Sequence, residues 1–136
     1  MSDAQQTLSI IKPDAVERNL GDTIKNEFLK NDFKIIKEKK IKLEKQEAEK
    51  FYQVHQTKPF YNELCSYLAS GPIIVMLLEK EDAIACNRKL MGATDPKKAE
   101  DGTLRKKYGI SIDKNSVHGS DSVENAKIEI DFFFKD

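Results

Sequence analysis

The sequence predicts an α+β domain in which a four-stranded antiparallel sheet packs with helices on one face, in a ferredoxin-like sandwich. Two observations lead to this fold class. Short apolar segments typical of strands alternate along the chain with segments whose apolar residues recur at helical spacing. The 136 residues contain neither an internal repeat nor a linker rich in Gly and Ser, so we expect one domain over residues 1–136.

Four apolar segments predict the strands, at residues 7–11, 33–43, 73–78 and 132–134. Pro13 lacks an N–H group and should end the ladder of the first strand. The third segment is an unbroken apolar run, which is typical of a central strand covered on both faces. The lysine-rich stretch from 37 to 45 is interleaved with glutamates, and we expect it on a solvated strand face. The fourth segment is expected as a strand or an apolar tail.

Helices are expected at residues 22–33, 44–55, 60–69, 81–91 and 121–130. Gly92 should close the fourth of these helices, and Asp121 with Glu124 forms an N-cap and N3 pair that should open the last. Residues 92–117 contain glycines, charges and few core residues. A connection of this length in a small domain is more often functional than idle.

Composition excludes several classes of protein. Lys and Arg number 23 and so do Asp and Glu, which argues against a protein that coats DNA or a membrane surface. No apolar run approaches the roughly 20 residues that span a bilayer. Residues 1–6 lack the features of a signal peptide, and Cys65 and Cys86 are expected as reduced, buried thiols. These features predict a cytoplasmic location.

The two histidines occupy different settings. His55 closes an apolar helical stripe, which favours a structural role without fixing it. His118 precedes Gly119, a polar turn and a helix start, where backbone N–H groups and the helix dipole favour anions such as phosphate. The same field disfavours a protonated ring and would leave a neutral nucleophile. The pattern alone is equally typical of a histidine that only lines a turn.

No glycine-rich phosphate-binding motif occurs in the chain, so side chains would have to hold the phosphates of any bound nucleotide. Lys12, Arg88 and Arg105 are candidates, because each lies at the end of an element or within residues 92–117. Each of the three is also compatible with an ordinary solvated charge. Cys, His and carboxylate spacings typical of zinc or calcium sites do not occur.

Six segments of the chain resemble the nucleoside diphosphate kinase family, in the same order and from about residue 6 to 134. They are Thr-Leu-Ser-Ile-Ile-Lys-Pro-Asp-Ala-Val at 7–16, Ser-Gly-Pro at 70–72, Asn-Arg at 87–88, Met-Gly-Ala-Thr-Asp-Pro at 91–96, Gly-Thr-Leu-Arg at 102–105, and 115–124 with its His-Gly-Ser-Asp-Ser core. The resemblance implies a ferredoxin-like domain that moves the γ-phosphate of a nucleoside triphosphate, mainly ATP, to a nucleoside diphosphate. The implied mechanism is ping-pong.

The resemblance also assigns the site. His118 matches the nucleophile, phosphorylated at the pros nitrogen, and Glu129 the carboxylate that orients it, while Tyr52 and Lys12 match residues beside the phosphate. The nucleotide-binding set implied by the resemblance is Lys12, Phe60, Arg88, Thr94, Arg105, Ile112, Asn115, Gly119 and Ser120. Within it Arg88, Thr94 and Arg105 hold phosphates, Asn115 meets the sugar 3′-hydroxyl, and the base lies between Phe60 and Ile112. Mg²⁺ is expected to enter on the nucleotide phosphates, with no metal ligand from protein side chains.

Two departures from the family pattern affect the expected assembly. Relatives commonly have Pro where this chain has Asp101, and the chain ends soon after Phe134. The resemblance implies a homo-oligomer, and the two departures leave tetramer and hexamer open. Two alternatives to the enzyme remain at this stage. One is a binding module of the same fold without catalysis; the other, a single-stranded nucleic-acid binder, is disfavoured by the neutral charge.

Overall fold

The computed structural model describes residues 4–53, 56, 57, 59, 61–110, 114 and 116–134. The predicted residues His55, Phe60, Ile112 and Asn115 lie outside the described residues. The strands are β1 (Gln5–Ile11), β2 (Lys34–Ile41), β3 (Ile73–Lys80) and β4 (Val117–Gly119). The helices are α1 (Pro13–Glu17), α2 (Gly21–Lys30), α3 (Lys45–Phe51), α4 (Tyr61–Leu68), α5 (Ala83–Met91), the 3₁₀ helix η2 (Pro96–Lys98), α6 (Leu104–Tyr108) and α7 (Val123–Phe134).

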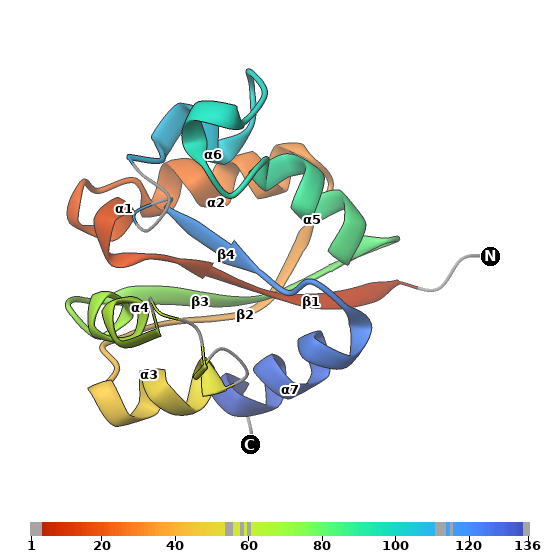
Figure 1. Cartoon of the computed structure of the whole chain (residues 1–136). Coiled ribbons are helices and arrows are strands. Elements are labelled where there is room, and N and C mark those ends of the chain that lie inside the picture. Colours follow the sequence, from red (N-terminus) through yellow and green to blue (C-terminus); the bar gives the residue numbers. More distant parts are fainter. Residues whose placement is uncertain are drawn as a thin grey trace.

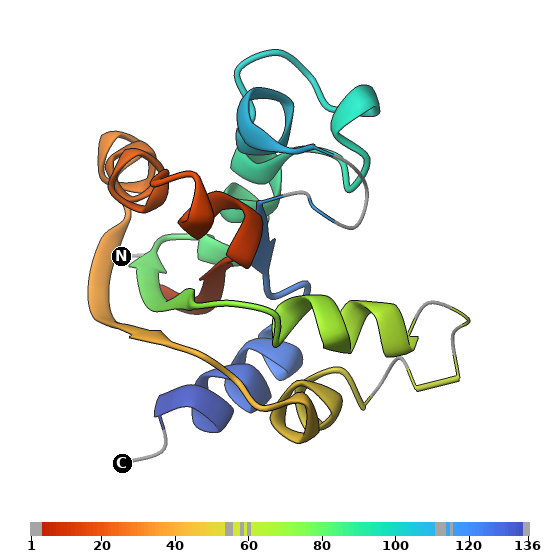
Figure 2. The same cartoon turned by 90° about the vertical axis from the view of Figure 1, so that its left-hand side faces the viewer.

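The strands form one sheet in the order β2-β3-β1-β4, and every neighbouring pair is antiparallel. This arrangement confirms the predicted fold class. β3 pairs on both sides, as its unbroken apolar run predicted. β2 is an edge strand, and the lysines at 37, 39 and 40 are exposed as expected. Figure 2 shows this strand, in orange, along one margin of the molecule.

Helices cover both faces of the sheet, with α2 and α5 on one side and α3, α4 and α7 on the other (Figure 1). The expectation of helices on one face was therefore wrong. The reason lies in β1, where Ile10 joins the core under α3, α4 and α7, and the adjacent Ile11 joins the core under α2 and α5. Since both faces of the interior strands are apolar, both require a helical layer.

The fourth strand is not the one that the sequence predicted. Residues 132–134 form the last turn of α7, in which Ala126, Ile130 and Phe133 continue a helical spacing toward the core. The actual fourth strand, β4, pairs with the end of β1, so that His118 lies opposite Ile10. Three residues are too few to show a strand periodicity, which explains why the sequence pattern missed it.

Smaller differences concern helix starts and one thiol. α1 was not anticipated, although Pro13 occupies the first helical turn, where its missing N–H group costs nothing. Ser122, not Asp121, caps α7: the Asn125 N–H donates to Ser122 Oγ at 3.1 Å. Both thiols are free and Cys65 is buried, but Cys86 is partly exposed. Within the described chain, no helix has the length and apolar character needed to cross a membrane.

Candidate functional site

The pairing of β1 with β4 brings two predicted site residues together. His118 lies opposite Ile10 in the sheet, and Ile10 is two residues before Lys12 in the sequence. The backbone N–H of Lys12 donates to the carbonyl of Ser116 at 2.8 Å, which ties the end of β1 to the start of β4. Lys12 is 5% exposed, far less than a solvated surface lysine. The sheet therefore fixes Lys12 and His118 relative to each other.

His118 contacts a carboxylate on the last helix. Its Nε2 lies 3.1 Å from Oε1 of Glu129, and the hydroxyl of Ser120 donates to the same oxygen at 2.8 Å. A neutral imidazole facing a carboxylate carries its hydrogen on the facing nitrogen, which assigns N–H to Nε2. Nδ1 is then the ring nitrogen whose lone pair can attack an electrophile. The same nitrogen is the one that the resemblance to the family predicted.

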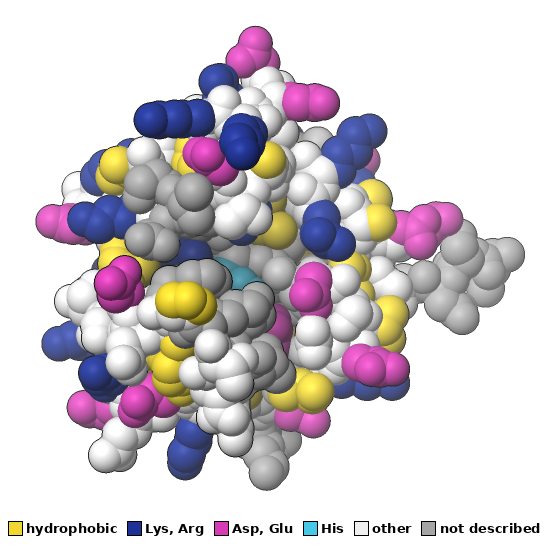
Figure 3. All heavy atoms as spheres, in the orientation of Figure 1, with side chains coloured by type: hydrophobic (Ala, Val, Ile, Leu, Met, Phe, Trp, Pro, Cys, Tyr) yellow, Lys and Arg dark blue, Asp and Glu magenta, His cyan; other side chains and the backbone are white. Residues whose placement is uncertain are grey.

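Aromatic rings form one wall beside the histidine. The ring of Phe51 lies 5.4 Å from that of His118, and the ring of Tyr52 lies 6.4 Å from it. Burial raises the pKa of Tyr52, so its phenol stays protonated at neutral pH and can donate a hydrogen bond. Phe51, Tyr52, His118 and Glu129 line a hollow of about 110 Å³. Figure 3 shows the histidine side chain, in cyan, set into a hollow of this face.

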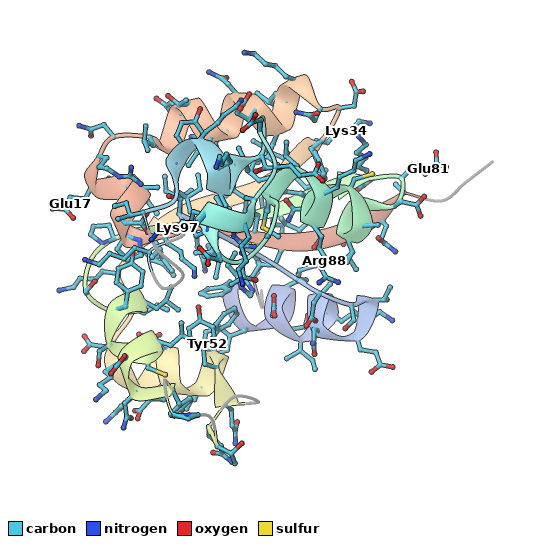
Figure 4. All side chains as sticks on the ribbon, turned by 45° about the horizontal axis from the view of Figure 1, so that its top comes forward. Glu17, Lys34, Tyr52, Glu81, Arg88 and Lys97 are labelled. Atoms are coloured by element: carbon cyan, nitrogen blue, oxygen red, sulfur yellow. The ribbon has the colours of Figure 1, made fainter. Side chains whose placement is uncertain are left out.

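A larger hollow of about 690 Å³ contains the predicted phosphate-holding residues Arg88, Thr94 and Arg105. Arg88 extends from α5 and is exposed, whereas Arg105 on α6 is buried. In Figure 4 the side chains of Arg88 and Tyr52 point toward the same region between α5 and the helices on the other side of the sheet. The site thus combines an open cationic hollow with a smaller one that holds the histidine.

Arg105 lines the larger hollow and also bonds the strand that carries His118. Its Nη1 donates to the carbonyl of Gly92 at 3.1 Å, and its Nη2 donates to the carbonyl of Val117, the residue before His118, at 3.0 Å. Burial lowers the pKa of Arg105 to about 10, with a further contribution from the nearby charge of Arg88. The guanidinium nevertheless keeps its charge at neutral pH, so a positive group lies directly against the strand that carries the histidine.

The structure brings most of the predicted residues to one place. Two hollows hold Tyr52, Arg88, Thr94, Arg105, His118, Gly119 and Glu129. Ser120 is connected to the site by its hydrogen bond to Glu129. Lys12 is connected to it by the bond from its backbone N–H to the carbonyl of Ser116, just before β4. Phe51 is an addition that the sequence did not single out; its position on the apolar stripe of α3 was the available signal.

Comparison with known proteins decides the family. The model of the family "Nucleoside diphosphate kinase" matches residues 5–136. The chain belongs to the nucleoside diphosphate kinase family. The nucleoside diphosphate kinase of a Nitratiruptor species is 55% identical over 130 residues, which are 96% of this chain and 95% of that protein. The corresponding protein of Campylobacter hominis is 57% identical over the same shares of the two chains.

Solved structures of the family have the same fold as this chain. A crystal structure of the Aquifex aeolicus nucleoside diphosphate kinase aligns with a TM-score of 0.95 at 37% identity, over 97% of this chain and 96% of that one. The enzyme from Encephalitozoon cuniculi, crystallised in an apo form, aligns with a TM-score of 0.94 at 36% identity, over 97% of this chain and 90% of that one. The family fold therefore extends over nearly the whole chain.

A methyl group at Gly119 should disturb this kinase-family site. A Cβ there would lie 2.3 Å from Nδ2 of the buried Asn87 and 2.8 Å from Cε of Met91. We expect Gly119→Ala to lower the free energy of unfolding by about 1–3 kcal/mol through overpacking and to slow phosphoryl transfer, because His118 is the adjacent residue. Denaturant unfolding and a coupled transfer assay measure the two effects.

Gly71→Ala is the matched control for this substitution. A Cβ at Gly71 would lie 3.6 Å from Cβ of Pro13, which is an ordinary van der Waals contact. This variant should unfold and react like the wild type. Unchanged stability and unchanged transfer in Gly119→Ala would contradict the close packing of α5 against the histidine strand.

Ser120→Ala should affect the orientation of Glu129. The hydroxyl of Ser120 donates to Glu129 and accepts from the N–H of Leu8 at 3.3 Å, so its loss leaves a buried amide without this partner. We expect a loss of about 1–2 kcal/mol in unfolding free energy and a several-fold lower kcat. Ser122→Ala, which removes the α7 cap, should cost about 1 kcal/mol and leave kcat unchanged. Equal kcat values in the two variants would contradict a role for Ser120 in holding Glu129.

Proposed function

We propose that this chain is an active nucleoside diphosphate kinase, which transfers the γ-phosphate of a nucleoside triphosphate, mainly ATP, to a nucleoside diphosphate and so maintains nucleoside triphosphate pools. The observation that carries the proposal is the pair formed by His118 and Glu129 beside a buried guanidinium. Oε1 of Glu129 lies 3.1 Å from Nε2 of His118, and the Arg105 guanidinium donates a hydrogen bond to the carbonyl of Val117, the residue before the histidine. This geometry combines an oriented nucleophile with a positive charge for phosphate, as phosphoryl transfer requires.

In the first step, Nδ1 of His118 attacks the γ-phosphorus of the triphosphate. The new N–P bond forms as the bond to the bridging oxygen breaks, and that oxygen keeps the electron pair, which releases the diphosphate. The imidazole becomes positively charged at this point, and the carboxylate of Glu129 stabilises this charge through the Nε2–H group. The terminal oxygen of a second diphosphate then attacks phosphorus, breaks the N–P bond and restores the neutral ring.

The cationic residues would neutralise charge on the transferred group. Arg88 and Arg105 line one hollow with Thr94, and Lys12 lies two positions beyond the strand partner of His118. Preorganised charges of this kind stabilise the negative oxygens of a phosphoryl group without reorganising during the reaction. We propose that the phenol of Tyr52, whose pKa is raised by burial so that it stays protonated, donates a hydrogen bond to the same phosphate.

We propose that Mg²⁺ enters with the nucleotide as part of the substrate. Within the described ranges, no group of three or more His, Cys, Asp or Glu side chains is arranged to hold a metal ion. Mg²⁺ characteristically binds substrate phosphates and keeps several of its waters. The ion would neutralise phosphate charge that the arginines and lysine do not reach.

The nucleoside end of the site follows from the family resemblance. Phe60 and Ile112 are proposed to hold the base, and Asn115 to contact the sugar 3′-hydroxyl. Stacking on a phenylalanine tolerates every base because each base has a π-face. We therefore expect the chain to accept purine and pyrimidine diphosphates alike.

A coupled spectrophotometric assay tests the proposed function. Purified protein is mixed with ATP, Mg²⁺ and a second nucleoside diphosphate, and formation of the new triphosphate is followed. The proposal predicts transfer that saturates in both substrates with the parallel double-reciprocal lines of a ping-pong reaction. Folded protein that binds ADP but transfers no phosphate would instead identify a nucleotide-binding module of the same fold.

We further propose that one domain, residues 1–136, self-associates into a tetramer or hexamer in the cytoplasm. The single domain over residues 1–136 is supported by the continuous sheet, which has helices on both faces. Self-association is supported by the eight-residue edge strand β2 and by two exposed apolar side chains, Ile36 of β2 at 44% and Leu29 of α2 at 53%. The two free cysteines are consistent with a reducing compartment. Sedimentation equilibrium measures the number of subunits.

A further inference from the structure

A polar network around the buried residues Asp14 and Ser116 joins the segments that carry Lys12, Arg105 and His118. Arg18 closes the network from the surface, with 37% of its side chain exposed. We propose that Asp14, which lies in α1, and Arg18, which caps the C-terminal end of α1, are positioning residues. They would hold Lys12, Arg105 and His118 at the distances that phosphoryl transfer needs. The inference deepens the proposed function and rests on it. Neither side chain lines the hollows that hold the predicted site residues, so both would act through other groups.

Asp14 is the centre of the network. Its side chain is 3% exposed, and a buried carboxylate is costly unless donors surround it. Three donors from different parts of the chain do so. Arg18 Nη2 lies 3.1 Å from Oδ2, the hydroxyl of Ser116 donates to Oδ2 at 2.8 Å, and the hydroxyl of Tyr67 on α4 donates to Oδ1. The N–H of Asp14 in turn donates to the Tyr67 oxygen at 2.9 Å.

Arg18 bonds both the end of α6 and the residue that precedes β4. Its Nη2 lies 2.6 Å from the carbonyl oxygen of Tyr108, the last residue of α6, and 3.0 Å from Oγ of Ser116, the residue before β4. Its Nε donates to the carbonyl of Asp14 at 3.0 Å. One guanidinium therefore joins the end of one element, the start of another and its own helix.

Ser116 transmits this arrangement to the site. Its side chain is fully buried and its φ of 73° lies in the left-handed region, which a non-glycine residue holds only when the surroundings fix it. Its carbonyl accepts from the N–H of Lys12 at 2.8 Å. The carbonyl of the next residue, Val117, accepts a hydrogen bond from the Arg105 guanidinium, and His118 follows Val117 directly.

The network thus connects to the groups of the predicted transfer step. Arg105 lies about one helical turn before Tyr108, His118 lies two residues after Ser116, and the N–H of Lys12 bonds Ser116 directly. Without Arg18, the end of α6 and the start of β4 would be joined by Ser116 Oγ, which lies 2.9 Å from the Tyr108 carbonyl oxygen, and by the bond from Arg105 to Val117, but no longer by a charged group tied to Asp14. A displacement of about 1 Å between reacting groups can cost on the order of 10²-fold in rate, even when the substituted residue is remote from the chemistry.

The test compares Arg18→Ala and Arg18→Lys with Lys107→Ala. Lys107 is the control because it also ties α6 to another helix, through Glu27 of α2 at 2.5 Å, and its side chain is about as exposed as that of Arg18. Its ion pair joins α6 to α2, whereas Arg18 joins α6 to the start of β4. Thermal melts first define a temperature at which all variants are folded. At that temperature kcat and KM are measured for ATP and a second nucleoside diphosphate. The ¹⁵N shifts of the His118 ring are recorded as a readout that does not depend on turnover.

We expect Arg18→Ala to lower kcat by about 10- to 100-fold, with a smaller change in KM, and to shift the His118 ring resonances. Arg18→Lys should recover only part of kcat, since an ammonium can meet Asp14 but cannot reproduce the fork geometry. Added methylguanidinium should partly restore kcat in Arg18→Ala alone. Lys107→Ala should match the wild type in all these measurements.

Two results would overturn the inference. The first is an Arg18→Ala variant with a lower melting temperature but wild-type kcat, KM and ring shifts, which would make the network purely structural. The second is a Lys107→Ala variant that loses as much kcat as Arg18→Ala. Failure of the proposed function is distinguishable, because the wild type itself would then transfer no phosphate. The ring shifts would still decide whether Arg18 positions His118.

Discussion

His118→Ala is expected to lower phosphoryl transfer by at least about 10⁴-fold, because it removes the atom that forms the bond to phosphorus. Nucleotide binding should persist in this variant. Arg88, Thr94 and Arg105 line a separate hollow, and the Arg105 bonds go to the carbonyls of Gly92 and Val117, which the substitution leaves in place. Steady-state kinetics and calorimetric titration with ADP measure the two properties separately.

His55→Ala is the matched control, since it removes the other histidine of the chain. It should retain transfer within a few-fold of the wild type. If His55→Ala were inactive and His118→Ala active, the nucleophile would be His55 and not His118. If His118→Ala lost ADP binding together with transfer, its inactivity would report a collapsed site and not a missing nucleophile.

Arg105→Lys should produce the second largest effect, a fall in kcat/KM of about 10²- to 10³-fold. The guanidinium spans two carbonyls, of Gly92 at 3.1 Å and of Val117 at 3.0 Å, while keeping its charge in the hollow shared with Arg88. A lysine keeps the charge but lacks the planar fork, so it cannot make these bonds and face a phosphate at the same time. The loss should appear in both kcat and KM, since phosphate is held before and during transfer.

Lys106→Ala is the control for this substitution. Lys106 is the next residue on α6, carries the same charge and is exposed. Its removal should change kcat/KM by less than about 3-fold, which corresponds to the weak effect of a solvated surface charge. A kcat/KM of Arg105→Lys that stays within about 3-fold of the wild type would show that a positive charge alone suffices at this position, and would contradict a specific role for the guanidinium of Arg105.

The central part of the fold could be predicted from the sequence because its apolar residues leave little choice. The unbroken run at 73–78 indicated a doubly covered strand, and β3 is one. A strand that is apolar on both faces also requires a helical layer on each face, although helices were expected on one face only. The phenylalanines at 132–134 were misplaced because a short apolar run does not distinguish a strand from the last turn of a helix. β4 was missed because its three residues show no period.

Local features of the sequence gave His118, Lys12, Arg88 and Arg105 as candidates without deciding for any of them, and the rest of the candidate site was assigned only through the family pattern. In the sequence alone, Arg105 is one of 23 basic residues, and nothing local indicates that it would be buried against Val117. Glu129 lies 11 residues from His118, and only the turn between β4 and α7 brings the two together. Arg18 and Asp14 gave no signal, because their partners are far away in the sequence and meet only in the folded chain.

The most direct test is to trap the phosphorylated protein. The wild type is mixed with γ-labelled ATP and Mg²⁺, denatured in SDS, and the retained label is tested for lability in acid and persistence in base. Phosphoryl transfer through the His118 ring predicts an acid-labile, base-stable label that is absent in His118→Ala. A folded wild-type protein without label, or a label retained in His118→Ala, would contradict it.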